Sequence, residues 1–283
     1  MLSFMTQLTH AVSGPTADPA PSPTDFDLTT RVVPANEDGR YDAELSDRWA
    51  ALVGTHGGYL VAIATRVAES HVPDRSVRTV TTTFLRPGHA GPATARATTL
   101  RHGRSISTVV VDLEQDGRTI ATSRLTLVPP VTGTEWRAPV IFDLPPPSEC
   151  SRIQERSSSE HFNRVDGCLD PSSLPFSEGD RAMVQGYMRP IEPRPIDAAW
   201  LTMASDWFPP PAFVRVAPPL GGISIDLTTH IHRTIATDQH DWLAARFEID
   251  TRSDGLAVEH GRICTLDGTV LAESFQTRWF AEG

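Results

Sequence analysis

The sequence contains no lysine, because all 25 basic residues of the 283-residue chain are arginine. Without a lysine amine, the chain cannot form a Schiff base with a carbonyl substrate or with pyridoxal phosphate. It also lacks the lysine that holds nucleotide phosphates in a P-loop. These enzyme classes are therefore excluded, and we expect the protein to need no cofactor.

Cysteine is scarce as well. Cys150, Cys168 and Cys264 are widely spaced and odd in number, which fits neither a disulfide framework nor a zinc site. They indicate unreactive thiols in a reducing compartment. His230 and His232 lie two residues apart in a predicted strand and so share one face, but no third ligand accompanies them. We expect no metal site.

Positive charge is in deficit, since the formal net charge is −10 at pH 7. A phosphate-binding surface is usually basic, so we expect no nucleic-acid partner. No apolar run approaches the length of about 20 residues that spans a membrane. The N-terminus lacks the pattern of a secretory signal, and Ala281-Glu282-Gly283 is not a peroxisomal tripeptide. We expect a cytoplasmic protein without a membrane span.

The first half of the chain shows one helix followed by a series of strands. Residues 1–24, rich in Pro, Ala, Ser and Thr, are predicted to be disordered. Leu60, Ile63, Ala64 and Val67 then recur at helical spacing within residues 53–70. Strands rich in β-branched residues are expected at 77–85, 93–101, 105–114 and 118–128.

The same order recurs in the second half. A helix is predicted at 196–207, and Met183 to Met188 reads as a short strand. Further strands are expected at 222–233, 241–250, 256–265 and 269–280. The repetition predicts an α+β fold with two tandem domains, 25–130 and 158–283, joined by a proline-rich linker at 131–157.

Short motifs in both halves resemble acyl-CoA thioesterase II enzymes. They are Gly57-Gly58-Tyr59, 84–88 (FLRPG), 99–105 (TLRHGRS), 204–206 (ASD), 223–226 (ISID) with His232-Arg233, and 272–276 (AESFQ). The resemblance implies a tandem (double) hot-dog fold, in which each long helix is wrapped by an antiparallel sheet. It also implies hydrolysis of acyl-CoA by a water held among Asp, Thr and Gln, and a possible homo-oligomer. These functional positions fall on Asp206, Ser224 and Gln276, with serine in place of threonine.

These residue types suit thioester hydrolysis. A carboxylate can accept a proton from water, while a hydroxyl and an amide can hold and orient that water. Asp206 follows Trp200 and Met203 and precedes Trp207 and Phe208, so partial burial should raise its pKa. The plain alternative is that Asp206 caps the helix or accepts a structural hydrogen bond.

Strand alternation leaves the placement of Ser224 unsettled. Ser224, Asp226, Thr228 and two histidines fall on one face, while the isoleucines and Leu227 fall on the other. The apolar face should cover the helix, so Ser224 would point away unless a bulge or the seam between domains receives it. Alternation does not place Gln276 either, because both faces of its strand are mixed.

Two glycines stand at the start of the first helix. Gly57 and Gly58 leave backbone N–H groups accessible there, which could form an oxyanion or substrate-binding site. Equally, they could let the helix pack tightly against the sheet.

Three functions are compatible with the sequence. The leading hypothesis is hydrolysis of an acyl-CoA or acyl-carrier thioester. The change from Thr to Ser224 and the irregular stretch 131–192 favour a polyketide or other specialised carrier-bound chain as the alternative. A non-catalytic acyl-binding protein is the third, but such a protein has no need of Asp206 or Gln276.

Overall fold

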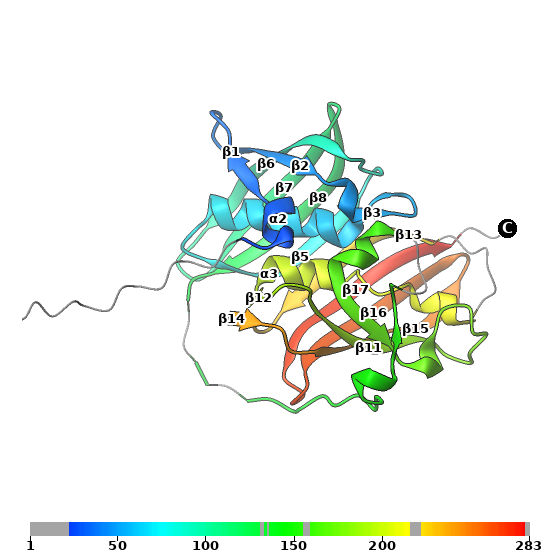
Figure 1. The fold of residues 1–283 in the computed structure, drawn as a ribbon. Coiled ribbons are helices and arrows are strands. Elements are labelled where there is room, and N and C mark those ends of the chain that lie inside the picture. Colours follow the sequence, from blue (N-terminus) through cyan, green and yellow to red (C-terminus); the bar gives the residue numbers. More distant parts are fainter. Residues whose placement is uncertain (1–22, 131–132, 135, 155–158, 216–221, 281–283) are drawn as a thin grey trace, which may run out of the picture.

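A single antiparallel sheet of thirteen strands dominates the protein (Figure 1). The computed structural model describes residues 23–130, 133–134, 136–154, 159–215 and 222–280. The strand order is β1-β2-β6-β7-β8-β5-β13-β17-β16-β15-β11-β10-β9. The strands of each half are therefore neighbours, and β5 and β13 join the halves through backbone pairing.

The first half supplies six strands of this sheet. They are β1 (Val32–Pro34), β2 (Arg40–Leu45), β5 (Ser76–Phe84), β6 (Gly91–His102), β7 (Ser107–Gln115) and β8 (Arg118–Val128). Buried and partly exposed residues alternate along β7, as expected of a strand with one face on a core. Asp116 and Gly117 both have positive φ in the two-residue turn to β8, as a tight hairpin connection of this kind requires.

The second half supplies the other seven. They are β9 (Ser151–Arg152), β10 (Val165–Leu169), β11 (Ala182–Pro190), β13 (Gly222–Ile231), β15 (Leu243–Ser253), β16 (Leu256–Thr265) and β17 (Val270–Phe280). Two small sheets lie outside, made of β3 (Ala50–Ala51) with β4 (Gly54–Thr55) and β12 (Arg194–Ile196) with β14 (Ile235–Gln239).

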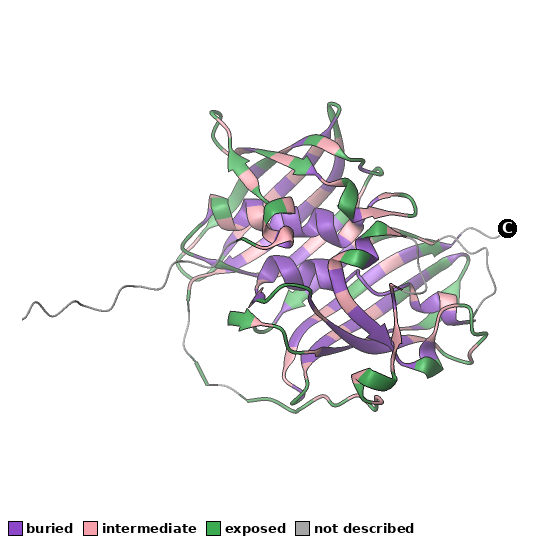
Figure 2. Cartoon of the chain, viewed as in Figure 1, coloured by how far each residue is buried: buried purple, intermediate pink, exposed green. Residues whose placement is uncertain are grey.

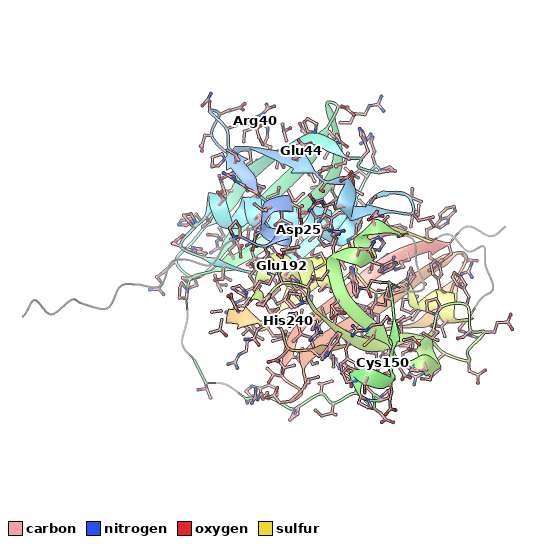
Figure 3. The ribbon with its side chains drawn as sticks, in the orientation of Figure 1. Asp25, Arg40, Glu44, Cys150, Glu192 and His240 are labelled. Carbon is pink, nitrogen blue, oxygen red and sulfur yellow. The ribbon has the colours of Figure 1, made fainter. Side chains whose placement is uncertain are left out.

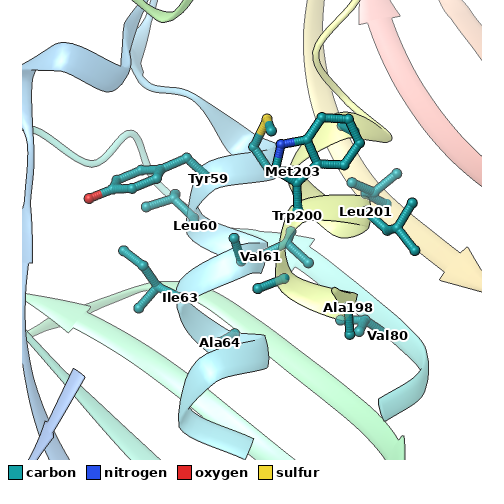
Figure 4. Close-up of a cluster of buried hydrophobic side chains, with 14 of the residues drawn as sticks. Tyr59, Leu60, Val61, Ile63, Ala64, Val80, Ala198, Trp200, Leu201 and Met203 are labelled. Carbon is teal, nitrogen blue, oxygen red and sulfur yellow. The ribbon is translucent and has the colours of Figure 1, made fainter. Parts of the chain in front are cut away.

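Helices α2 (Gly57–His71) and α3 (Ala198–Ala204) pack against each other on one side of the sheet (Figure 1). The Gly58 amide meets Asp206 at one end, and Arg66 meets Asp197 at the other, so the helices run antiparallel. Thr65 of α2 meets Thr202 of α3, and apolar side chains of both helices, including Leu60, Val61 and Met203, lie in one buried cluster (Figure 4). Most residues of both helices are buried, which explains why their sequences are nearly continuously apolar (Figure 2).

The remaining helices are short. They are α1 (Asp25–Thr29) and the 3-10 turns η1 (Asp47–Trp49), η2 (Pro147–Glu149), η3 (Glu160–Arg164), η4 (Pro171–Ser173) and η5 (Pro211–Arg215). Thr24 and Asp27 form a capping box on α1, which satisfies the first amides of that turn. Next to it, the Asp25 amide donates to Glu192, so α1 is bonded to the second half of the chain (Figure 3).

The predicted α+β architecture is confirmed, with three differences. The two expected sheets are one sheet. The second helix is shorter than 196–207, because Asp197 caps it and the chain turns at Ser205. Patterning also missed β1, β2, β3, β4, β9, β10, β12 and β14. The domain boundaries stay a prediction, and most of residues 1–24 lies outside the described residues.

Candidate active site

Asp206 lies immediately beyond the C-terminal end of α3 and is buried, at 8% exposure. Its Oδ2 accepts a hydrogen bond of 2.9 Å from the Gly58 amide at the start of α2. Its Oδ1 accepts from Gln276 Nε2 at 2.8 Å and from Arg278 Nη2 at 3.1 Å. The carboxylate is thus held by both halves of the chain, and a helix N-terminus favours its negative charge.

Ser224 lies close to Asp206 because β13 contains a β-bulge. Ser224 pairs with Arg278, whereas Asp226 pairs with Thr277, so Ile225 is an extra residue. The insertion turns Ser224 to the inner face, the same face as buried Leu227. Simple alternation placed these two residues on opposite faces, and the bulge is the reason that it fails here.

Gln276 lies on the inner face of β17 and is 1% exposed. Its Nε2 donates to Asp206 Oδ1 and, at 2.5 Å, to Ser224 Oγ. The structure therefore brings together the three predicted residues. Gln276 contacts both of the others and bridges Asp206 and Ser224.

Three further residues in this cluster were missed in the sequence. Arg278 follows Gln276 by two positions, which places it on the same face of β17, and it bonds Glu259 of β16 at 2.7 Å. His56 caps α2 by accepting from the Tyr59 amide at Nδ1, and its Nε2 donates to the Asp206 carbonyl at 3.0 Å. The i, i+2 relation of Gln276 and Arg278 was a signal that could have identified Arg278.

The pKa of Asp206 is lowered, so the predicted rise is wrong. Burial acts to raise this pKa, as the sequence suggested. The proximity of His56 and Arg278, together with hydrogen bonds from Gln276 and Gly58, more than offsets it. Apolar neighbours in the sequence gave no indication of these partners, most of which come from distant parts of the chain.

Two histidines behind the carboxylate, His56 and His161, have lowered pKa values. Burial lowers the pKa of His56, and burial lowers that of His161 from η3 to about 3. The two rings stack with centroids 4.7 Å apart. Since His56 accepts at Nδ1 and donates at Nε2, its tautomer is fixed by its neighbours.

Gly57 and Gly58 serve close packing in this structure. A Cβ on Gly57 would lie 2.8 Å from Asp206 Oδ2, and one on Gly58 would lie 2.5 Å from the Met203 carbonyl oxygen. The Gly57 Cβ would also lie 3.0 Å from Phe84 of strand β5, so the tight contacts are with the sheet, as the sequence suggested, and with the end of α3 and Asp206 as well. Because the Gly58 amide is bonded to Asp206, an oxyanion role for it stays a prediction.

The two strand histidines that share a face lie elsewhere. His232 pairs with Glu273 at 2.9 Å, and His230 contacts Thr79. In the described part of the chain, no group of three or more His, Cys, Asp or Glu is arranged to hold a metal ion. The helices of the described residues are all too short or too polar to cross a membrane.

Comparison with known proteins identifies both halves. Residues 45–128 match the acyl-CoA thioesterase N-terminal domain, and residues 144–280 match the acyl-CoA thioesterase C-terminal domain. No curated protein matches the chain.

Solved structures agree in fold. A hot-dog-fold protein from Alicyclobacillus acidocaldarius is 22% identical with a TM-score of 0.83, covering 92% of this chain and 99% of its own. A protein assigned as a thioesterase II from Thermobifida fusca is 27% identical with a TM-score of 0.78, covering 92% and 98%. An acyl-CoA thioesterase II from Mycobacterium marinum is 21% identical with a TM-score of 0.73, again covering 92% and 98%. The fold is a tandem hot-dog, and the chain is a thioester hydrolase that belongs to the acyl-CoA thioesterase family.

Proposed function

We propose that the protein hydrolyses an acyl-CoA to the free acid and CoA, with Asp206 as the general base. The observation that supports this most strongly is the convergence of Asp206, Ser224 and Gln276, in which the Gln276 amide hydrogen-bonds both Asp206 and Ser224. A carboxylate, a hydroxyl and an amide in one buried cluster suit the delivery of water to a carbonyl.

The proposed reaction needs little from the enzyme, because a thioester carbonyl is already electrophilic. Asp206 takes a proton from water as the water oxygen bonds to the carbonyl carbon. The tetrahedral intermediate then collapses, the C–S bond breaks, and the proton passes from Asp206 to the departing thiolate. Ser224 and Gln276 hold the water and the carbonyl oxygen during these steps.

Thiol release from acyl-CoAs of several chain lengths tests this proposal, with wild type compared to Asp206→Asn. Loss of the general base should lower kcat by about 1000-fold. Asp197→Asn is the matched control, because Asp197 adjoins the other end of α3 and bonds two arginines. Undiminished turnover by folded Asp206→Asn would contradict the assignment.

A carrier-bound, specialised acyl chain is the second candidate. Part of the irregular stretch that suggested it packs elsewhere, since Phe142 and Leu144 lie against Tyr187 on the opposite face of the sheet. Another part reaches the cluster, because His161 stacks on His56. Faster release from carrier-bound than from CoA-bound chains would favour this candidate. Acyl binding without any thiol release would favour a non-catalytic role.

A further inference from the structure

Arg278 is a buried cation that contacts all three of the residues predicted for the site. It is 4% exposed, and its guanidinium donates to Asp206 Oδ1 at 3.1 Å, to Gln276 Oε1 at 2.8 Å and to Ser224 Oγ at 3.2 Å. Its Nε donates to Glu259 Oε2 at 2.7 Å, and Glu259 is 3% exposed. Glu259 therefore anchors the base of the guanidinium while the other end faces the candidate site.

The guanidinium fixes the orientation of the Gln276 amide. Arginine has only donors, so the atom of Gln276 that faces it must be the carbonyl oxygen. Both hydrogens of Nε2 then point to Asp206 and Ser224. A flipped amide would place two donors against each other at Arg278 and would set its oxygen against the Asp206 carboxylate, and the Ser224 hydroxyl would then have to donate to Gln276.

The same reasoning sets the direction of the Ser224 hydroxyl. Its oxygen accepts from Gln276 Nε2 and from Arg278 Nη1, and neither of these groups can accept in return. Both acceptor positions are thereby occupied. The hydroxyl hydrogen is left to donate, which is the polarity needed to stabilise a carbonyl oxygen that is gaining negative charge.

We propose that Arg278, anchored by Glu259, is a positioning residue that turns Ser224 into a hydrogen-bond donor and holds the Gln276 amide toward Asp206. This inference rests on the proposed function and deepens it. It divides the roles of the cluster: Ser224 faces the substrate carbonyl, and Asp206 with Gln276 faces the water.

A merely structural role for the buried ion pair can be separated from positioning, because the protein contains a matched pair. Arg262 of β16 and Glu273 of β17 lie on the same two strands and face the opposite side, with Nη2 and Oε1 2.6 Å apart. Neither residue contacts Asp206, Ser224 or Gln276 in any described interaction.

Two variants test the positioning role. Arg278→Lys keeps the charge but cannot reproduce the planar fork that reaches several acceptors. The double variant Glu259→Leu with Arg278→Met replaces the pair by apolar groups, an exchange that folded proteins often tolerate. The matched double variant, Glu273→Leu with Arg262→Met, controls for loss of an ion pair between these strands.

We expect Arg278→Lys and the Glu259/Arg278 double variant to lower kcat by about tenfold to 100-fold, which is less than the loss of about 100-fold to 1000-fold for removing an oxyanion donor, because Ser224 itself stays in place. KM should change little, because the lost interaction develops in the transition state. The Glu273/Arg262 control should keep wild-type kcat. Unchanged kcat in Arg278→Lys, with wild type active, would overturn the positioning role and leave the proposed function standing.

The pH profile gives a second readout. Of the described residues, the titratable or charged groups facing Asp206 are His56, Arg278 and Glu259, with His161 stacked behind His56. Arg278→Lys retains a cation beside Asp206, so the acid limb of its pH–rate profile should stay at the same low pH as in wild type. In the double variant the acid limb should move to higher pH, because burial then acts on Asp206 with less opposition. An unmoved acid limb in the folded double variant would contradict the proposal.

Solvent exchange of the Gln276 side-chain amide protons provides a test that does not require activity. These NMR signals are identified by their loss in Gln276→Leu. They should be protected in wild type and exchange faster in Arg278→Lys. If wild type released no thiol, the proposed function would fail, whereas equal protection in both proteins would refute the positioning role alone.

Discussion

The two ends of the antiparallel α2/α3 pair carry different polar clusters. At one end, Asp206 bonds the Gln276 amide and Arg278 in a nearly solvent-free setting, and both of these also bond the Ser224 hydroxyl. At the other, Arg66 and Arg194 each bond both Asp27 and Asp197, with contacts of 2.7 to 3.0 Å, which closes a ring of four charges.

This difference shows what distinguishes a reactive end from a structural one in a duplicated fold. In the ring, each aspartate is balanced by two guanidinium groups, and Asp197 also caps α3 by accepting from the Trp200 amide. In the described contacts, the Thr24 hydroxyl donates to Asp27 and accepts from Arg194, but no side-chain amide joins the ring. The Asp206 end combines one carboxylate with groups that can hold a neutral molecule, so we place the chemistry there.

Asp197→Ala tests whether the Asp197 end of the helix pair is structural, and it should have the largest effect on stability of the variants proposed here. This change removes a partner from both Arg66 and Arg194, the latter 3% exposed, and it deletes the cap of α3. We expect a loss of about 3 kcal/mol in the free energy of unfolding, measured by urea denaturation. The kcat of the folded fraction should remain near wild type. A large loss of kcat with little loss of stability would show that this end also takes part in the reaction.

Ser224→Ala should have the opposite signature. Without the hydroxyl, we expect kcat to fall by about 50-fold, or about 2.3 kcal/mol of transition-state stabilisation. Since Ser224 is half-buried at a bulge, the melting temperature should change little. Steady-state kinetics and thermal melting of the same preparation distinguish the two effects, and a variant with full kcat would remove Ser224 from the site.

Glu69→Gln tests the charge balance at the Asp197 end through the pH dependence of stability. Burial raises the pKa of Glu69 from 4.5 to about 7, Asp197 adds to the rise, and Arg66 opposes it. A raised pKa means that the stabilising contribution is present below pH 4.5 and is lost as pH rises through 7. Glu69→Gln should therefore be more stable than wild type by about 2 kcal/mol at pH 8, with a much smaller difference at pH 5. Equal urea midpoints at pH 8 would contradict this.

Ser224→Thr is the gentlest test, because it installs the residue that the family resemblance implies. The hydroxyl is retained, so we expect kcat within about tenfold of wild type. The contrast with Ser224→Ala isolates the hydroxyl from the extra methyl group. A loss as large as that of Ser224→Ala would mean that the bulge has no room for the methyl.

Much of the fold could be predicted from periodicity. Most strands of 77–128 and 222–280 lie where the sequence predicts them, and α2 has a clear helical spacing. The missed strands β1 and β12 are short, and both contain proline, which weakens the strand signal. The sequence does not predict that β5 pairs with β13. Nothing in the sequence of either strand marks it as the one that joins the two halves.

The site was predictable only in part. Asp206, Ser224 and Gln276 were found through family motifs, and the structure brings their side chains together. Alternation alone would have rejected Ser224, since a bulge leaves no reliable mark in a single sequence. The lowered pKa of Asp206 depends on partners 148 and 72 residues away along the chain, Gly58 and Arg278.

The shared backbone pairing of β5 and β13 has a mechanical consequence. Asp226 to His230 pair residue by residue with Thr83 to Thr79, so a hinge motion that parted the two halves would have to break this ladder. His56 and Gly58 come from one half, while Asp206 and Arg278 come from the other. The paired strands β5 and β13 therefore hold the two halves together. An acyl chain must then be admitted by movement of side chains and connecting segments while the two halves stay paired.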